Sequence, residues 1–270
     1  ELEVLSNSKN KVNEKYLETI LFESKQLLKL LQKSNYIISK TDQKKVLDRY
    51  RYLYGLESNT NNFIGTNVVS LEIQHVLNFL SNNYNVTDKA DGDRFFLIII
   101  NRKVYLISTN LEVKYTGIEL DKKLEKYNDV LLDGEYIFLK EKNKYIFMVF
   151  DCLTKNNNSN CFEEKNIQKR LDNMNKVIYD CFGDKNTYKF NNIVTGDISK
   201  YLNFHSDELD KYLNQLNKDI DESKDLLIRS KYFIPVLGVQ DNEIYKYSKL
   251  LWNKYIYNNK ITVPYDLDGL

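Results

Sequence analysis

Residues 89–100 read Lys-Ala-Asp-Gly-Asp-Arg-Phe-Phe-Leu-Ile-Ile-Ile, a charged turn that leads directly into an apolar run. The run at 95–100 has the length and β-rich composition of a buried strand. Gly92 predicts a tight turn that holds Lys89 and Arg94 near one another. A neighbouring guanidinium would lower the pKa of the lysine, and a lysine nucleophile needs such a shift. The segment therefore predicts a loop at the entry to a strand and a candidate reactive lysine.

The same loop has a plainer interpretation as a solvated strand entry, so the rest of the chain has to decide. Residues 131–138 (LLDGEYIF) predict an Asp-Gly turn between two strands, with Glu135 at the start of the second strand. Residues 145–151 (YIFMVFD) predict a buried strand that ends in Phe150 and an acid, and the sequence closes on 265–270 (YDLDGL). A single Asp-Gly pair usually marks only a turn, but an ordered series of such segments indicates a site.

The sequence around these segments predicts an α+β fold. Helices are expected at 16–34, 41–54, 70–80, 162–183, 206–222 and 243–257, with Thr41 as an N-cap and Gly55 as a stop. Strands are expected at 95–100, 104–108, 111–115, 130–132, 135–139, 145–150, 226–229 and 233–239. Most breaks between strands have the length of turns, which indicates antiparallel sheet rather than βαβ units. The polar stretch 57–62 is the best linker, so 1–60 is expected to be a helical connector and 61–270 the main domain.

The composition excludes several classes of protein. The 270 residues carry 39 Lys and Arg against 38 Asp and Glu, a net charge of +1, which argues against a general nucleic-acid coat and leaves room for a local basic groove. Cys152, Cys161 and Cys181 have no metal-binding spacing, and with only His75 and His205 beside them we expect reduced structural cysteines rather than zinc. No apolar run reaches the roughly 18 residues that span a bilayer, so no membrane partner is expected.

The series KADGDR, LLDGEYIF, YIFMVFD and YDLDGL resembles the successive motifs of the covalent nucleotidyltransferase superfamily. That superfamily contains mRNA capping guanylyltransferases and ATP-dependent polynucleotide ligases. The fourth motif, Asp268-Gly269-Leu270, is typical of capping enzymes, whereas ligases have Glu-Gly there. The resemblance covers about residues 62–270 and implies a nucleotidyltransferase fold of antiparallel sheets flanked by helices. A fifth motif and an oligonucleotide-binding (OB) fold domain would lie beyond Leu270.

The resemblance also implies a reaction. Lys89 would attack the α-phosphorus of GTP, expel pyrophosphate and hold GMP through a phosphoramidate, and the GMP would then pass to the 5′-diphosphate end of RNA. Asp91 and Gly92 would fix the geometry of the loop. Asp268 would help to hold Mg²⁺ or Mn²⁺ near the phosphates. These parts suit phosphoryl transfer, which needs mainly positioning and charge neutralisation.

Three further residues would bind the nucleotide if the resemblance holds. Arg94 would contact its sugar side, Glu135 would bind the ribose or shape the site beside Lys89, and Phe150 would stack on the guanine. A stacked aromatic ring accepts any base, so Phe150 alone would not select guanine.

The first residues suggest a subfamily. Glu1 and Glu3 alternate along a predicted strand and resemble the closing strand of metal-dependent RNA triphosphatases, so they are candidate metal ligands, although an exposed charged end explains them equally well. In the capping enzymes of large cytoplasmic DNA viruses such a domain precedes the guanylyltransferase. A methyltransferase domain or subunit would be a partner, and the location would be cytoplasmic, in a viral factory or virion.

Two alternatives remain open from the sequence. One is the adenylylation domain of an ATP-dependent DNA or RNA ligase, and the other is a catalytically silent scaffold that docks a capping partner. Labelling from GTP, labelling from ATP, or no covalent adduct would separate the three interpretations.

Overall fold

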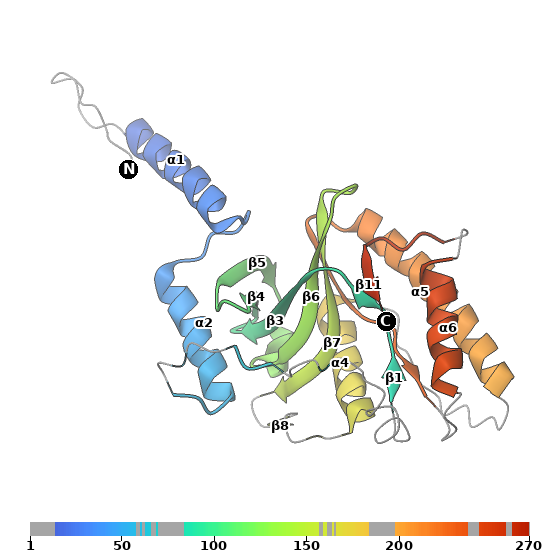
Figure 1. Ribbon diagram of the computed structural model, residues 1–270. Coiled ribbons are helices and arrows are strands. Elements are labelled where there is room, and N and C mark those ends of the chain that lie inside the picture. The colour runs from blue at the N-terminus through green and yellow to red at the C-terminus, as the bar shows by residue number, and fades with distance from the viewer. Residues whose placement is uncertain are drawn as a thin grey trace.

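The computed structural model describes residues 14–57, 60, 63–65, 69, 84–156, 159–160, 164, 166–183, 198–236, 243–257 and 261–269. Within these ranges the chain has an α+β fold, in which a strongly curled sheet lies among helices (Figure 1). The helix expected at 70–80 with His75, and also Cys161, Glu1 and Glu3, lie outside the described residues. Cys152 is buried and Cys181 half-buried, and both are free thiols.

The main sheet has seven strands in the order β5-β4-β3-β6-β7-β8, and β9 pairs with β7 off this path. The strands are β3 (Asp93–Ile100), β4 (Lys103–Ser108), β5 (Val113–Glu119), β6 (Leu131–Leu139), β7 (Lys144–Asn156), β8 (Ser159–Asn160) and β9 (Leu226–Ser230). The ladders along the path are antiparallel, as expected. The β7–β9 ladder is parallel, because the chain crosses back through α4 (Ile167–Phe182) and α5 (Ile198–Glu222) before β9, so the sheet is rich in antiparallel pairs but includes one parallel pair among the described strands.

Strand β6 differs from what the sequence predicted at Asp133-Gly134. The predicted turn at Asp133-Gly134 is absent, and β6 runs through it as one strand with a register shift against β7 between these two residues. A Cβ on Gly134 would lie 2.6 Å from Phe147 Cζ and 2.7 Å from the Met148 carbonyl oxygen. The glycine therefore serves close approach of neighbouring strands rather than a reversal of the chain.

Most of the described helices lie close to their expected positions, but α5 begins at Ile198, eight residues before the expected start at 206. They are α1 (Glu14–Gln32), α2 (Lys40–Leu53), the 3-10 helix η1 (Lys122–Tyr127), α4 (Ile167–Phe182), α5 (Ile198–Glu222) and α6 (Glu243–Tyr255). The N-cap of α2 is Ser39 rather than Thr41, because the Ser39 hydroxyl accepts the backbone N–H of Asp42. Gly55 follows the helix with a φ of +64°, as a helix stop should.

Three apolar clusters divide the core between the two faces of the sheet. One cluster joins the odd-numbered residues of β3 to α4, and a second joins the even-numbered residues of β3 to α2. A third joins the far ends of β6 and β7 to α5 and α6. Figure 1 shows α1 projecting from this body, and the helix has no buried residue.

Two short strand pairs flank the main sheet. Strand β1 (Asn85–Val86) pairs with β10 (Ile234–Pro235), and β2 (Lys89–Ala90) pairs with β11 (Leu267–Gly269). The second pair brings the first and the last of the sequence motifs together, and the candidate site is built around it.

Candidate active site

The strand pair β2–β11 holds the candidate nucleophile. Ala90 lies opposite Leu267 and is buried in the α5–α6 cluster, which anchors the strand. The backbone N–H of Asp91 donates to the Asp266 carbonyl at 2.9 Å. Outside this anchor, the Lys89 ammonium donates a hydrogen bond to the Asp268 carboxylate. Two motifs 179 residues apart therefore meet at an exposed ion pair.

The protonation of Lys89 differs from the sequence-based expectation. The hydrogen bond to Asp268 raises the pKa of Lys89, and the charges of Glu135 and Asp91 act in the same direction. The predicted lowering by Arg94 is wrong, because the Arg94 guanidinium contacts a different carboxylate. Lys89 is therefore protonated here, and it must leave Asp268 and lose a proton before it can act as a nucleophile.

Arg94 forms the second ion pair of the site, with Asp133. The Arg94 Nε lies 3.0 Å from Asp133 Oδ1, and Nη2 lies 2.5 Å from Oδ2, a two-pronged geometry. The Asp133 side chain is only 1% exposed. Burial raises the pKa of Asp133 to about 6, although the charge of Arg94 opposes the shift.

Arg94 also packs under a short loop. Its guanidinium carbon lies 5.6 Å from the ring centroid of Phe63, and a Cβ on Gly65 would lie 2.5 Å from Arg94 Nη2. The described contacts of Arg94 are thus with the protein, and its predicted contact with a nucleotide sugar stays a prediction.

The carboxylates of the site interrupt an apolar row. On one face of β6, Leu131 packs in the α2 cluster and Ile137 in the α5–α6 cluster. Asp133 and Glu135 lie between them, on the face toward Lys89 and Arg94. Burial raises the pKa of Glu135 to about 7, while the charges of Lys231 and Lys89 oppose the shift. Alternation along the strand therefore positions both acids where the two clusters separate.

Gly92 lies against this same strand. A Cβ on Gly92 would lie 2.8 Å from Ile137 Cγ1, 2.9 Å from the Tyr136 carbonyl oxygen and 3.0 Å from Glu135 Cγ. The glycine is therefore required by the close approach of the Lys89 loop to β6. Asp91 next to it is exposed.

Phe150 and a lysine that the sequence motifs did not identify complete the site. Phe150 is half-buried on β7, with the Arg94 guanidinium carbon and the Lys231 Nζ each 5.9 Å from its ring centroid. Lys231 is 5% exposed, and its Nζ donates to the Asp88 carbonyl at 3.0 Å and lies 3.8 Å from Asp88 Oδ2. In the sequence, the feature that could have identified Lys231 as a site residue is its position directly after the apolar strand β9.

The residues near Lys89 are compatible with a magnesium ion bound through the substrate. Among the residues that the structure describes, no group of three or more metal-ligating side chains occurs. Mg²⁺ at phosphate-handling sites is commonly held by one or two carboxylates and the substrate phosphates, so the exposed Asp268 carboxylate fits such a site. Glu1 and Glu3 cannot be placed, because they lie outside the described residues.

Comparisons with known proteins bear on this geometry. Residues 36–247 match the family model described as "mRNA capping enzyme, catalytic domain". The match begins within the segment expected to be a connector and ends before Asp268. The chain is 34% identical over 266 residues to a protein from Acanthamoeba polyphaga mimivirus that is named "Probable mRNA-capping enzyme". The matched region covers 96% of this chain. The chain spans only 22% of that relative's length. Across the described helices, none has the length and hydropathy of a membrane span.

Proposed function

The chain belongs to the mRNA capping enzyme catalytic-domain family, and from this premise we propose that it is the guanylyltransferase segment of a viral-type capping enzyme. Lys89 forms a covalent lysyl-GMP intermediate from GTP, and the GMP then passes to the 5′-diphosphate end of RNA. The observation that carries the proposal is the meeting of Lys89, Asp268 and Glu135, which come from three separate motifs.

The covalent step makes one bond and breaks one. The neutral Lys89 Nζ attacks the α-phosphorus, the bond from that phosphorus to the bridging oxygen breaks, and pyrophosphate leaves with the electron pair. Asp268 holds the Lys89 ammonium in the structure, and Lys89 has to leave this carboxylate before it attacks. A divalent ion held by Asp268 and the triphosphate neutralises phosphate charge when bound. In this proposal Glu135 takes the lysine proton near neutral pH, which is supported by its pKa of about 7 and by the interaction of its charge with Lys89.

The same arrangement supports a preference for guanine. Phe150 offers a half-buried ring for the base, and the Lys231 ammonium lies beside that ring. An ammonium is only a donor, so it pairs with a carbonyl oxygen at the base edge and not with an amino group. Guanine has the carbonyl where adenine has the amino group. Lys231 therefore favours GTP over ATP in this proposal.

The test is covalent labelling of the full-length protein. The protein is incubated with Mg²⁺ or Mn²⁺ and with GTP or ATP labelled at the α-phosphate, and the acid-labile adduct is measured. We expect labelling from GTP that is lost in Lys89→Ala and kept in Lys103→Ala, a matched change of another exposed lysine. Labelling from ATP alone would favour a ligase, and no adduct with either nucleotide would favour a scaffold.

The wider setting is also part of the proposal. The relative's greater length supports further catalytic domains in the same polypeptide, including a triphosphatase site with Glu1 and Glu3 and a methyltransferase partner. The viral source of that relative supports action in the cytoplasm, where a viral factory or virion makes transcripts. Fractionation of infected cells, with the adduct as the readout, tests the location.

A further inference from the structure

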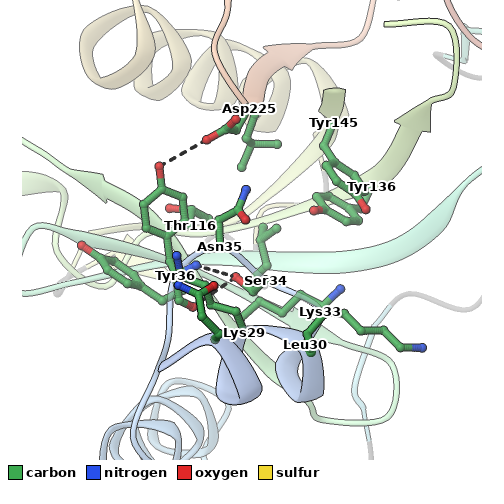
Figure 2. A pocket seen from close by; sticks show the side chains of 15 residues that line it. Lys29, Leu30, Lys33, Ser34, Asn35, Tyr36, Thr116, Tyr136, Tyr145 and Asp225 are labelled. Carbon is green, nitrogen blue, oxygen red and sulfur yellow. Dashed lines mark hydrogen bonds between the residues drawn. The ribbon is translucent and has the colours of Figure 1, made fainter. Parts of the chain in front are cut away.

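A cavity lies on the other face of the sheet from Lys89. It has a volume of about 560 Å³ and lies between the last turn of α1, strands β4 and β5, and the β6–β7 hairpin (Figure 2). Tyr136 lines it, whereas Glu135, the next residue along β6, lies on the face toward Lys89. Adjacent residues of a strand point to opposite faces, so this cavity is separate from the candidate active site although the two share a strand.

The cavity has a basic lining. Three lysines and one acid line it, Lys29, Lys33, Lys114 and Asp225, in a protein whose whole net charge is +1. The Lys114 Nζ lies 5.4 Å from the ring centroid of Phe95 and 5.3 Å from that of Tyr136, and burial lowers the pKa of Lys114. The acid Asp225 already accepts the Tyr36 hydroxyl at 3.4 Å. Because burial disfavours the ammonium form of Lys114, the positive charge that favours an anionic ligand lies mainly on Lys29 and Lys33.

Aromatic rings form a row along the same wall. The Tyr136 and Tyr145 rings are stacked, with centroids 4.7 Å apart and planes 8° from parallel. The ring centroids of Phe138 and Tyr145 are 4.9 Å apart, and Phe138 is 44% exposed. Figure 2 shows Tyr136 and Tyr145 side by side at the cavity, with Lys29 and Lys33 on the wall formed by α1. The row runs from the cavity toward the exposed end of the hairpin.

The α1 wall is held in place by Tyr36. A Cβ on Gly117, whose φ is +77°, would lie 2.2 Å from Tyr36 Cε1, so the tyrosine rests directly on the glycine of β5. Its ring also packs edge-on against Tyr115, with centroids 6.1 Å apart. Lys29 and Lys33 are therefore carried on a segment that is docked to the sheet.

We propose that this cavity and its aromatic row bind single-stranded RNA downstream of the end that is capped. The proposal rests on the proposed function for the presence of RNA, and it adds a second place where the transcript is held. Amines that track phosphates, combined with rings on which bases stack, are the shared chemistry of proteins that bind single strands without sequence preference. Because Tyr136 and Tyr145 stack on each other, the surface for a base is the exposed Phe138 ring at the end of the row. A base at Phe138 together with phosphates at Lys29 and Lys33 suits a chain rather than a lone nucleotide.

The first test measures binding of an RNA oligonucleotide with a 5′-hydroxyl end, which cannot accept GMP. The full-length protein is titrated by fluorescence anisotropy at several salt concentrations. In Lys29→Gln/Lys33→Gln we expect affinity to fall roughly tenfold and the slope of log affinity against log salt to fall by about 1.4, since each phosphate contact with a single strand contributes about 0.7. Lys211→Gln/Lys218→Gln on α5 carries the same charge change and should bind like the wild type.

The second test removes an exposed ring. Phe138→Ala leaves the core intact because the side chain lies at the surface, and we expect RNA affinity to fall roughly fivefold or more. GMP at millimolar concentration should not displace the RNA. Wild-type affinity in both the lysine and the phenylalanine variants, an equal loss in the α5 control, or displacement by GMP would overturn the proposal. Lysyl-GMP formation, measured in the same preparations, should stay at the wild-type level, so failure of the proposed function would be seen separately.

Discussion

Two ion pairs of the candidate site, Lys89–Asp268 and Arg94–Asp133, differ in burial. The side chains of Lys89 and Asp268 are 55% and 59% exposed, whereas those of Arg94 and Asp133 are 22% and 1% exposed. The first pair joins two short strands beside the sheet, and the second lies on adjacent strands within it. The same chemical contact therefore occurs once in a solvated setting and once in a packed one.

The buried pair is part of the scaffold of the site, and the exposed pair is the part that reacts. An exposed pair contributes little to stability and can open when a nucleotide arrives. A buried two-pronged pair cannot lose one partner without leaving an uncompensated charge. We therefore expect changes at Asp133 to affect folding and changes at Asp268 to affect chemistry.

Removal of the buried acid should have the largest effect. Asp133→Ala leaves Arg94 without its two-pronged partner, and we expect the free energy of unfolding to fall by about 3–5 kcal/mol in urea titrations. Asp133→Asn, which keeps the shape and can still accept a hydrogen bond, should lose less. Equal stability of the alanine variant and the wild type would refute the scaffold role.

Added volume at Gly92, where the loop that carries Lys89 approaches β6, should have the next largest effect on stability. Gly92→Ala places a methyl group 2.8–3.0 Å from atoms of β6, and we expect a loss of about 1–3 kcal/mol from overpacking together with reduced lysyl-GMP formation. Gly55→Ala is the matched control, since nothing lies within 4 Å of its added Cβ, although its φ of +64° gives it a backbone cost of its own. A Gly92 variant with unchanged stability and labelling would show that the close approach is unnecessary.

Glu135, the acid that lies between the two ion pairs, should make the free energy of unfolding depend on pH. The pKa of Glu135 is raised to about 7, so its neutral form is favoured in the fold, and its contribution to stability is present at low pH and lost as pH rises through about 7. Relative to Glu135→Gln, the wild type should therefore lose about 1–2 kcal/mol between pH 5 and 8, allowing for partial exposure. Urea unfolding at several pH values measures this, and a constant difference between the two proteins would contradict the burial of the acid.

The exposed acid should have the smallest effect on stability. Asp268→Asn should change the free energy of unfolding by less than about 0.5 kcal/mol, because the pair is solvated. The same variant should lose most of its lysyl-GMP formation at low Mg²⁺, where a carboxylate ligand matters most. A large loss of stability with normal labelling would reverse the assignment of the two pairs.

The sequence predicted some of this well and some of it poorly, for physical reasons. The helices and most strands follow from apolar periodicity, which is local. The bulge at Asp133-Gly134 and the parallel β7–β9 ladder depend on which strands meet, and periodicity does not encode that. The sequence singled out Gly134 but predicted a turn there. In the structure this glycine allows the close approach of Phe147.

The site divides in the same way. Lys89, Glu135 and Asp268 could be listed from their motifs, but their contacts could not. Arg94 was expected near Lys89 because Gly92 predicted a tight turn between them, whereas the Arg94 guanidinium pairs with Asp133. Lys231 follows β9 far along the sequence, and only the parallel pairing of β9 with β7 brings it to Phe150.

If Lys89 is the nucleophile, the covalent adduct has to map to its side chain. The full-length protein is incubated with GTP and Mg²⁺, digested, and analysed by mass spectrometry under conditions that preserve phosphoramidates. We predict that the peptide containing Lys89 carries the mass of GMP, and that the modification is absent without GTP. A GMP adduct on any other residue, with the Lys89 peptide unmodified, would contradict the account.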